Sequence, residues 1–517
     1  MPNEDAKIRK LKDSRRKAIE GGGQARIQKQ HNKGKLTARE RISELVDPGS
    51  FHELEMFATR RVDNQDPDSE KYYSDGVVTG FGQVNGRPVY LYAQDFTIMG
   101  GALGEVQSRK ICRVMDLAAQ NGAPIIGMID SGGARIQEGV HSLGGYAKIF
   151  RRNSLYSGVI PQISLILGPC AGGAAYSPAL TDIILMVEKQ SYMFLTGPNV
   201  IKAVTGEVVD FENLGGANVH LSTSGTAHLT AKSEKDAIAM CRTLLAYLPN
   251  NNMENPPYYA PADDPLRVER SLNEIVPEDP STPYLMHEVI QKIIDRNSFL
   301  ELQPAFATNA IIGLARMDGG TVGIVAQEPS VLAGVIDIDA SDKIFRFVRF
   351  CDCFNIPIIT FVDSPGFLPG VNQEHRGIIR HGAKVLYAYS EATVPKISLV
   401  TRKAYGGAYV VMSSKYLGTD FTFAWPTAEI AVMGPEGAAN ILYGKQIDNA
   451  DDPEAERERL TKEYQEKFLN PYAAAEAGYV DDILEPSKTR QNIIAALAVC
   501  REKQVPAPTR KHGNSPV

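Results

Sequence analysis

The chain has 517 residues and a formal net charge of −6, with 43% hydrophobic and 22% charged residues. This length predicts at least two domains, and the negative charge argues against nucleic acid as a general partner. No segment approaches the ~20 apolar residues of a membrane span, and the charged first residues lack the apolar core of a signal peptide, so we expect a cytoplasmic protein with no direct membrane span.

The first segment, residues 1–50, has the pattern of a basic, helical extension. Three glycines at 21–23 interrupt that pattern, so we expect one helix on either side of them. Two larger domains are expected to follow, over residues 51–265 and 266–517. A polar, proline-rich stretch at 248–265 reads as the linker between them.

These two domains carry an internal repeat. TGFGQVNGRPVYLYAQD (79–95) resembles IGLARMDGGTVGIVAQE (312–328) at an offset of 233, and PQISLILGPCAGGAAY (161–176) resembles PKISLVTRKAYGGAYV (395–410) at 234. One inserted residue over ~90 aligned positions is too regular for chance, so the chain holds two copies of one fold.

Each copy alternates short apolar runs of strand length, such as PIIGMID and PIITFVD, with helical patterns such as residues 105–120. Strands that are apolar on both faces and separated by helices are typical of largely parallel sheets. The sequence therefore predicts an α/β fold built from a tandem pseudo-repeat.

Each copy also has two glycine-rich turns at expected strand ends, where backbone N–H groups at a helix N-terminus can bind an anionic oxygen. Such glycines can also serve tight turns and close packing alone. Their repetition in register favours one oxyanion hole in each copy. The turns are DSGGAR (130–135), AGGAAY (171–176), DSPGF (363–367) and YGGAYV (405–410).

Several catalytic motifs are absent from the sequence. It has no GxxxxGK[ST] loop, no GxSxG elbow, no HExxH and no paired CxxC, so we expect no P-loop, no serine hydrolase and no metal site. Oxyanion sites without an evident nucleophile or metal fit enolate formation, with the proton acceptor supplied from elsewhere.

Together these motifs resemble the carboxyltransferase family of biotin-dependent carboxylases, over about residues 10–514. The pattern is closest to propionyl-CoA carboxylase β chains, methylmalonyl-CoA decarboxylase α chains and transcarboxylase large subunits. The segments that carry the resemblance are KQHNKGKLTARERI (29–42), DSGGARIQEG (130–139), GPCAGGAAYSPALTD (168–182), TGPNVIKAVTGE (196–207), DSPGFLPG (363–370), RKAYGGAY (402–409), AWPTAEIAVMGPEGAAN (424–440) and KHGN (511–514).

The resemblance implies a crotonase-like fold in each copy and a homo-hexamer whose active unit is a dimer. The N-domain of one subunit, which binds acyl-CoA, would face the C-domain of its mate, which binds biotin. The biotin would be carried by a biotin carboxyl carrier protein, and a biotin carboxylase is the further expected partner. The sequence agrees, since it has no AMKM-like biotinyl-lysine motif and no ATP loop.

The same resemblance implies roles for individual residues. Gly172 and Gly173 should donate N–H groups to the thioester carbonyl, and Gly407 and Ala408 should hold the ureido oxygen of biotin. The substrate pocket is expected to include Gly132, Gly133, Ala134, Arg135, Ala174 and Val410, and the biotin side Gly366, Phe367, Gly406 and Tyr409. No metal ligand is expected. Lys35, Arg39 and Arg41 are candidates for the CoA phosphates, with helix-surface salt bridges as the equal alternative.

The implied reaction moves a carboxyl group between carboxybiotin and the α carbon of propionyl-CoA or methylmalonyl-CoA, as in propionyl-CoA carboxylase. Biotin would act as carrier and as base for the α-proton. Many propionyl-CoA carboxylases have Asp where this chain has Val410, so the α subunit of a sodium-pumping methylmalonyl-CoA decarboxylase stays an alternative. A crotonase-like enoyl-CoA hydratase or isomerase that uses Glu138 as acid or base, and a non-catalytic scaffold, are alternatives of other classes.

Overall fold

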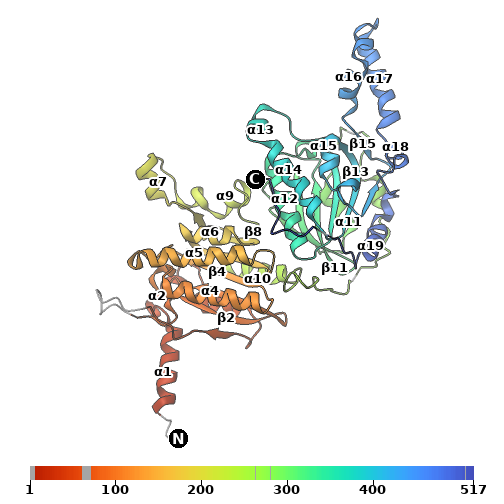
Figure 1. Cartoon of the computed structure of the whole chain (residues 1–517). Coiled ribbons are helices and arrows are strands. Elements are labelled where there is room, and N and C mark those ends of the chain that lie inside the picture. The colour runs from red at the N-terminus through yellow and green to blue at the C-terminus, as the bar shows by residue number, and fades with distance from the viewer. Residues whose placement is uncertain (1–5, 61–70, 262, 280, 507, 517) are drawn as a thin grey trace. The chain divides into compact units, whose positions relative to one another are not determined.

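The computed structural model describes residues 6–60, 71–261, 263–279, 281–506 and 508–516. The chain divides into two compact units, Met1–Glu254 and Asn255–Val517. Each unit contains an eight-stranded sheet (Figure 1). The division falls inside the proline-rich stretch at 248–265.

The sheet of the first unit has the order β1-β2-β3-β4-β5-β6-β8, with β7 paired to β5. Its first three strands are antiparallel neighbours, and pairing is parallel from β3 onward. β4 and β5 are rich in Ile and Leu and almost wholly buried, as expected for strands covered on both faces. The strands are β1(His52–Leu54), β2(Val77–Val84), β3(Arg87–Gln94), β4(Ile125–Ser131), β5(Gln162–Ala171), β6(Ile183–Val187), β7(Tyr192–Phe194) and β8(Leu229–Ala231).

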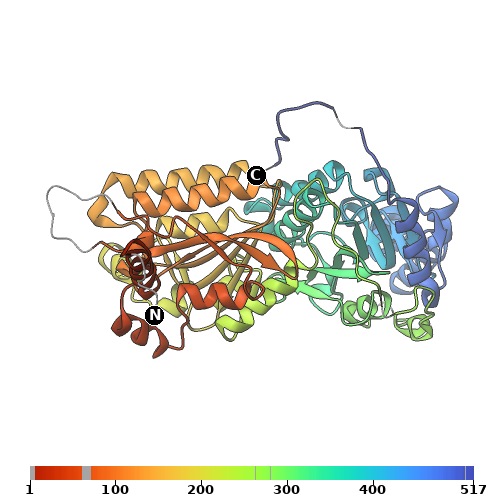
Figure 2. The same ribbon diagram turned by 90° about the horizontal axis from the view of Figure 1, so that it is seen from below.

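Helices cover both faces of this first sheet. α4(Glu105–Gln120) and α5(Val140–Leu155) lie side by side on one face, and α3(Ala38–Leu45) packs with α10(Glu234–Leu245) on the other (Figure 2). The unit also contains the short helices α6(Gly173–Ala179), α7(Pro198–Thr205), α8(Phe211–Gly215) and α9(Ala217–Ser222).

The N-terminal segment has three helices where the sequence predicts two. Gly21 and Gly23 have positive φ values of 54° and 90° and separate α1(Ala6–Glu20) from α2(Gln24–His31), as expected. A further break precedes α3, which starts with a capping box: Glu40 N–H donates to Thr37 Oγ1 and Thr37 N–H donates to Glu40 Oε2. This Thr-x-x-Glu signal is readable in the sequence and was missed.

The sheet of the second unit has the order β16-β14-β13-β12-β11-β10-β9, with β15 paired to β13. β10, β11 and β12 begin and end 233 residues after β2, β3 and β4, and the helix α12(Ile338–Cys353) stands in the same relation to α4. The predicted α/β pseudo-repeat is therefore confirmed. The strands are β9(Leu300–Leu302), β10(Ala310–Met317), β11(Gly320–Gln327), β12(Ile358–Ser364), β13(Lys396–Tyr405), β14(Phe421–Ala424), β15(Glu429–Ala431) and β16(Asp482–Ile483).

In the second unit α12 and α14 pack together, and α16 and α17 form an antiparallel pair that projects from the sheet (Figure 1). Among the described residues, none of the helices combines the length and apolar character needed to cross a membrane. The helices are α11(Met286–Ile293), α12(Ile338–Cys353), α13(Val371–His375), α14(Ile378–Glu391), α15(Gly406–Val411), α16(Pro435–Asp448), α17(Pro453–Phe468), α18(Pro471–Glu476) and α19(Thr489–Val499).

Candidate active site

Two glycine turns meet at the carboxyl ends of β4 and β5, which are parallel neighbours. The β4 turn (residues 130–135) and the β5 turn (residues 171–176) touch, because a Cβ atom built on Gly133 would lie 3.0 Å from the carbonyl oxygen of Ala171. Gly133 has a φ of 103°, a conformation that favours glycine. This contact brings the two turns together at one edge of the sheet, as an oxyanion hole built from both would require.

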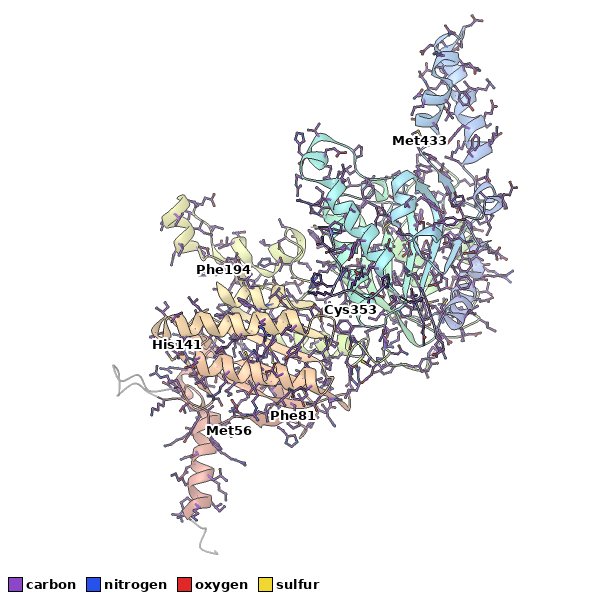
Figure 3. The ribbon with its side chains drawn as sticks, in the orientation of Figure 1. Met56, Phe81, His141, Phe194, Cys353 and Met433 are labelled. Atoms are coloured by element: carbon purple, nitrogen blue, oxygen red, sulfur yellow. The ribbon has the colours of Figure 1, made fainter. Side chains whose placement is uncertain are left out.

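In the β5 turn, the amides that are free to donate lie one residue further along the chain than the sequence predicts. The N–H of Gly172 donates to the carbonyl oxygen of Phe194 at 2.9 Å, so it is not the donor that the sequence predicts; Phe194 is labelled in Figure 3. Gly172 is the N-cap of α6, which begins at Gly173. Gly173 and Ala174 therefore occupy the first two helical positions, where N–H groups have no intrahelical acceptor. These are the candidate donors.

The β4 turn is held by its own hydrogen bonds. The N–H of Gly132 donates to the carbonyl oxygen of Gly100 at 3.0 Å, and the N–H of Gly133 donates to Ser131 Oγ at 3.2 Å. Ala134 forms a parallel bridge with Leu103. Of these predicted pocket residues, Gly132 and Gly133 thus shape the turn, because their amides already have partners.

The sequence predicts that Arg135 contacts the substrate. The structure corrects this prediction, because the Arg135 side chain is turned into the protein. It is wholly buried and forms ion pairs with Asp75 at 2.9 Å and Glu138 at 2.6 Å. The other oxygen of Glu138 accepts the N–H of Glu105 at 2.6 Å. Burial raises the pKa of Asp75 although Arg135 opposes it. Glu138 is therefore bound on both oxygens, which argues against it as the base of a hydratase.

The cations of KLTARERI are also committed to protein partners. Lys35 Nζ lies 2.6 Å and Arg41 Nη2 lies 2.9 Å from Asp130 Oδ2, and Arg39 Nη2 donates to Glu53 at 3.0 Å. Burial acts to lower the pKa of Arg41, but the carboxylates of Asp130 and Glu234 together outweigh it and hold that pKa above its ordinary value. Both sequence hypotheses for these residues, CoA phosphates and helix-surface salt bridges, are wrong for Lys35 and Arg41, because their side chains are almost fully buried.

A different set of cations surrounds an open cavity beside the β4 turn. Arg26, Lys29 and Lys33 line a cavity of about 340 Å³ together with Phe96 and Gly100. Its wall is joined to the turn, since Gly100 accepts the N–H of Gly132. Positive side chains together with an aromatic ring suit a ligand with phosphates and a flat ring. Their spacing in the sequence gave no sign that they line one cavity, because α2 ends between Lys29 and Lys33.

The second unit repeats the two turns on β12 and β13. Phe367 bridges Ile336 as Ala134 bridges Leu103, and Gly366 and Gly406 have positive φ values of 144° and 54°. Gly407 and Ala408 lie in the first turn of α15, where amide donors lack intrahelical acceptors. A Cβ atom built on Gly407 would lie 3.5 Å from the Phe367 ring, so this ring borders the amides.

Tyr409 and Val410 follow these amides on α15. Burial raises the pKa of Tyr409 to about 12, and its hydroxyl is buried without a hydrogen-bond partner in the described part of the chain. Val410 is 43% exposed. His381 lies on α14, where its Nδ1 is 2.9 Å from both oxygens of Asp342. Among the residues that the structure describes, no group of three or more His, Cys, Asp or Glu side chains could hold a metal ion.

The fold and the turns define a protein that offers backbone amides to an anionic oxygen in each of two homologous units. A family model described as "Carboxyl transferase domain" matches residues 29–515, and the chain belongs to this family. The crotonase-like fold that the resemblance implies is thereby confirmed for both units.

Two relatives and one solved structure give the range of the similarity. The chain is 57% identical over 517 residues to the "Propionyl-CoA carboxylase, carboxyltransferase subunit" of Haloferax mediterranei, covering 100% of each chain. It is 54% identical to the "Methylmalonyl-CoA decarboxylase subunit alpha" of Propionigenium modestum, covering 99% of each. A transcarboxylase 12S crystal structure, described as a hexamer with methylmalonyl-coenzyme A bound, matches with a TM-score of 0.97, 50% identity and coverage of 100% and 99%.

Proposed function

We propose that this chain is the carboxyltransferase subunit of a biotin-dependent acyl-CoA carboxylase, acting on propionyl-CoA and methylmalonyl-CoA. One observation carries the proposal: in each unit two neighbouring parallel strands end in glycine turns, and the second turn leads into a helix whose first amides have no intrahelical acceptor. Two anionic oxygens, one on each reactant, need two such sites, and the pseudo-repeat supplies them.

On the acyl side, the Gly173 and Ala174 amides would donate to the thioester oxygen. As the α carbon loses its proton, negative charge moves onto that oxygen and the two N–H bonds strengthen. Donors fixed in place before the reaction stabilise this enolate without reorganisation, and one such donor contributes about 10²–10³ in rate. Asp130 and Glu138, the carboxylates in and directly after the β4 turn, are tied in ion pairs, so neither is free to act as the base, and a base from outside the unit fits the site.

On the other side, the residues fit a flat, neutral ureido ring. Gly407 leaves the amides of α15 uncovered, the Phe367 ring borders them, and the orphaned Tyr409 hydroxyl lies one residue beyond Ala408. Biotin, when bound on its carrier protein, supplies the carboxyl group and the ureido nitrogen that accepts the α-proton. Gly407 and Ala408 would hold the ureido oxygen and Phe367 would exclude water.

The cavity beside the β4 turn would bind the CoA phosphates. Its cations, Arg26, Lys29 and Lys33, replace the KLTARERI cations as the proposed anion contacts. Arg26 is fixed by donating to the hydroxyl of Tyr72 at 2.9 Å. The wall of the cavity is hydrogen-bonded at Gly100 to the acyl-side turn, which brings the thioester of a bound acyl-CoA towards the same edge of the sheet.

We further propose a homo-hexamer in the cytoplasm that works with a biotin carboxyl carrier protein and a biotin carboxylase. The hexamer of the similar transcarboxylase 12S supports this assembly. Large apolar side chains stand exposed on the first unit beside α7 and on the second unit along α16, as expected for surfaces that other subunits cover. They include Val204, Val208, Ile441 and Leu442.

The deciding experiment uses the purified chain with free biotin and methylmalonyl-CoA. Release of CO2 that depends on biotin supports carboxyl transfer, while a chain that never decarboxylates the thioester under any biotin concentration argues against it. Crotonyl-CoA serves as the control substrate. Its hydration without biotin would instead support the hydratase alternative, which already requires a carboxylate that Glu138 does not offer.

The decarboxylase alternative is favoured by one observation, the 54% identity to a methylmalonyl-CoA decarboxylase α subunit. It uses the same half-reaction, so the test is a reconstitution. Adding a biotin carboxylase and carrier with ATP should carboxylate propionyl-CoA if the chain serves a carboxylase. Co-purification with a membrane-spanning subunit from the native source would favour the pump.

A further inference from the structure

Both units support their first turn with the same parts. Asp130 is the last residue but one of β4 and Asp363 the last but one of β12, and each is fully buried. The N–H of Asp130 donates to Gln94 Oε1 at 3.4 Å, and the N–H of Asp363 donates to Gln327 Oε1 at 3.2 Å. All four residues stand at the repeat offset of 233. A buried carboxylate needs a cation and hydrogen bonds to remain charged.

The two units obtain that cation from different places. In the second unit β13 supplies it: Arg402 Nε lies 3.1 Å from Asp363 Oδ2, and the N–H of Lys403 donates to Asp363 Oδ1 at 3.1 Å. The corresponding residues of β5, at the offset of 234, are Gly168 and Pro169. Gly168 has no side chain and Pro169 has no N–H, so β5 can provide neither contact.

In the first unit the N-terminal segment supplies the cation instead. Asp130 Oδ2 accepts from Lys35 Nζ at 2.6 Å, from Arg41 Nη2 at 2.9 Å and from Gln30 Nε2 at 3.1 Å. A Cβ atom built on Gly168 would lie 2.5 Å from Lys35 Nζ and 2.0 Å from Asp130 Oδ1. The Lys35–Asp130 pair therefore occupies the space that a side chain at position 168 would need.

The N-terminal segment does not replace every contact that β13 provides in the second unit. Asp130 Oδ1 is buried and has no hydrogen-bond partner among the described residues, whereas Asp363 Oδ1 accepts the Lys403 N–H. Among the residues that the structure describes, the side chains that bond to the Asp130 carboxylate are those of Gln30, Lys35 and Arg41, all from residues 30–41. Removing this segment would leave a buried carboxylate without these cations at the first residue of the β4 turn.

We propose that residues 30–41 are a positioning element for the acyl-side turns, and that Lys35 and Arg41 hold Asp130 in the role that Arg402 has in the second unit. The assignment of these turns to the acyl reactant rests on the proposed function. The same stretch of chain faces the cavity with Gln30 and Lys33 and faces Asp130 with Lys35. It thereby connects the site proposed for the CoA phosphates with the turn that carries the thioester contacts.

The test compares two lysines two residues apart. In Lys35→Met, amide hydrogen exchange in peptides covering residues 131–135 should be at least about tenfold faster, while peptides covering residues 364–367 keep the wild-type rate. Biotin-dependent decarboxylation of methylmalonyl-CoA should lose roughly ten- to hundredfold in kcat with KM within about twofold, as expected for misplaced donors. Lys33→Met should raise KM and leave exchange in both turns unchanged. Lys35→Arg should restore most of the kcat.

The proposal would be overturned if Lys35→Met changed the exchange rates of residues 131–135 and 364–367 by the same factor relative to wild type. A wild-type kcat in Lys35→Met would also overturn it. If Lys35→Met does not fold, Asp130→Asn/Lys35→Met removes both charges together and is the variant to measure. It should fold and show the same turn-specific exchange, and wild-type exchange in it would equally overturn the proposal. Amide hydrogen exchange is measured without catalytic turnover. A chain without any carboxyl-transfer activity would therefore refute the proposed function, while the exchange rates would still decide the positioning role of residues 30–41.

Discussion

The N–H of Ala174 gives the sharpest test of the backbone-amide site. Proline at this position removes the N–H group, and proline is tolerated in the first turn of a helix because the missing donor has no intrahelical acceptor there. Ala174 is the second residue of α6, and its side chain lines a small cavity of about 20 Å³ with Tyr92 and Tyr146. Ala174→Pro should therefore lower the free energy of unfolding by about 1 kcal/mol or less.

Activity should respond much more strongly than stability. Removing one fixed donor to an oxyanion costs about 10²–10³ in kcat, or roughly 2.7–4 kcal/mol of transition-state stabilisation. The assay is biotin-dependent decarboxylation of methylmalonyl-CoA, with acyl-CoA binding measured separately by calorimetry. Ala174→Ser keeps the N–H and should retain wild-type kcat, so it is the matched control for the side chain.

A second control separates the amide from the helix. The N–H of Ala175 donates to the carbonyl oxygen of Gly172 at 3.1 Å, so Ala175→Pro deletes a hydrogen bond that the fold uses. It should cost about 1–3 kcal/mol of stability, more than Ala174→Pro. If Ala174→Pro retained more than about a third of the wild-type kcat, the N–H of Ala174 would not be a donor to the transition state and the reasoning would be wrong.

Three further outcomes follow from the same geometry. Lys29→Ala/Lys33→Ala should raise the KM for acyl-CoA about three- to tenfold at low salt and flatten its salt dependence, whereas Lys10→Ala on α1 should not; an unchanged KM would remove these cations from the CoA site. Arg135→Met should lower the free energy of unfolding by about 3–5 kcal/mol because it leaves Asp75 and Glu138 without their cation, and a folded variant with only a raised KM would restore Arg135 as a substrate contact. Glu301 and Glu328 raise the pKa of His287 to about 9. The contribution of His287 to the free energy of unfolding is full below its unfolded pKa of about 6.5 and is lost as the pH rises through 9. After discounting for solvent screening it is about 1–2 kcal/mol. Urea unfolding of wild type and His287→Gln at pH 6 and pH 10 measures it, and a difference in stability that does not change with pH would contradict it.

The sequence predicted the repeat and its strands because both depend on local pattern. Apolar runs such as residues 125–131 and 358–364 are buried on both faces, and such runs have the same appearance in any parallel sheet. The meeting of the β4 and β5 turns was predictable for the same reason, since adjacent parallel strands end at one edge.

The residues that the sequence misplaced depend on long-range pairing. Gly172 and Gly173 are indistinguishable in a glycine pair, and only the pairing of β5 with β7 shows that the first amide is consumed by Phe194. In the sequence, Arg41 has the pattern of a helix-surface cation. In the structure α3 packs against α10, which buries Arg41 beside Glu234. Comparing the two repeats would have helped, because Gly168 opposite Arg402 marks a missing cation in the first copy.

The same site can serve relatives named for carboxylation and for decarboxylation because a catalyst does not set the direction of a reaction. The Gly173, Ala174, Gly407 and Ala408 amides would bind one transition state, which is crossed in both directions. Their effect on the forward and reverse kcat/KM must therefore be equal, so that their ratio stays fixed by the equilibrium. Ala174→Pro should lower carboxylation of propionyl-CoA and decarboxylation of methylmalonyl-CoA by the same factor. Unequal factors in the two assays would mean that the amide acts on a step outside carboxyl transfer. Equal factors would mean that the direction in the cell is set by the partner that loads or empties the carrier.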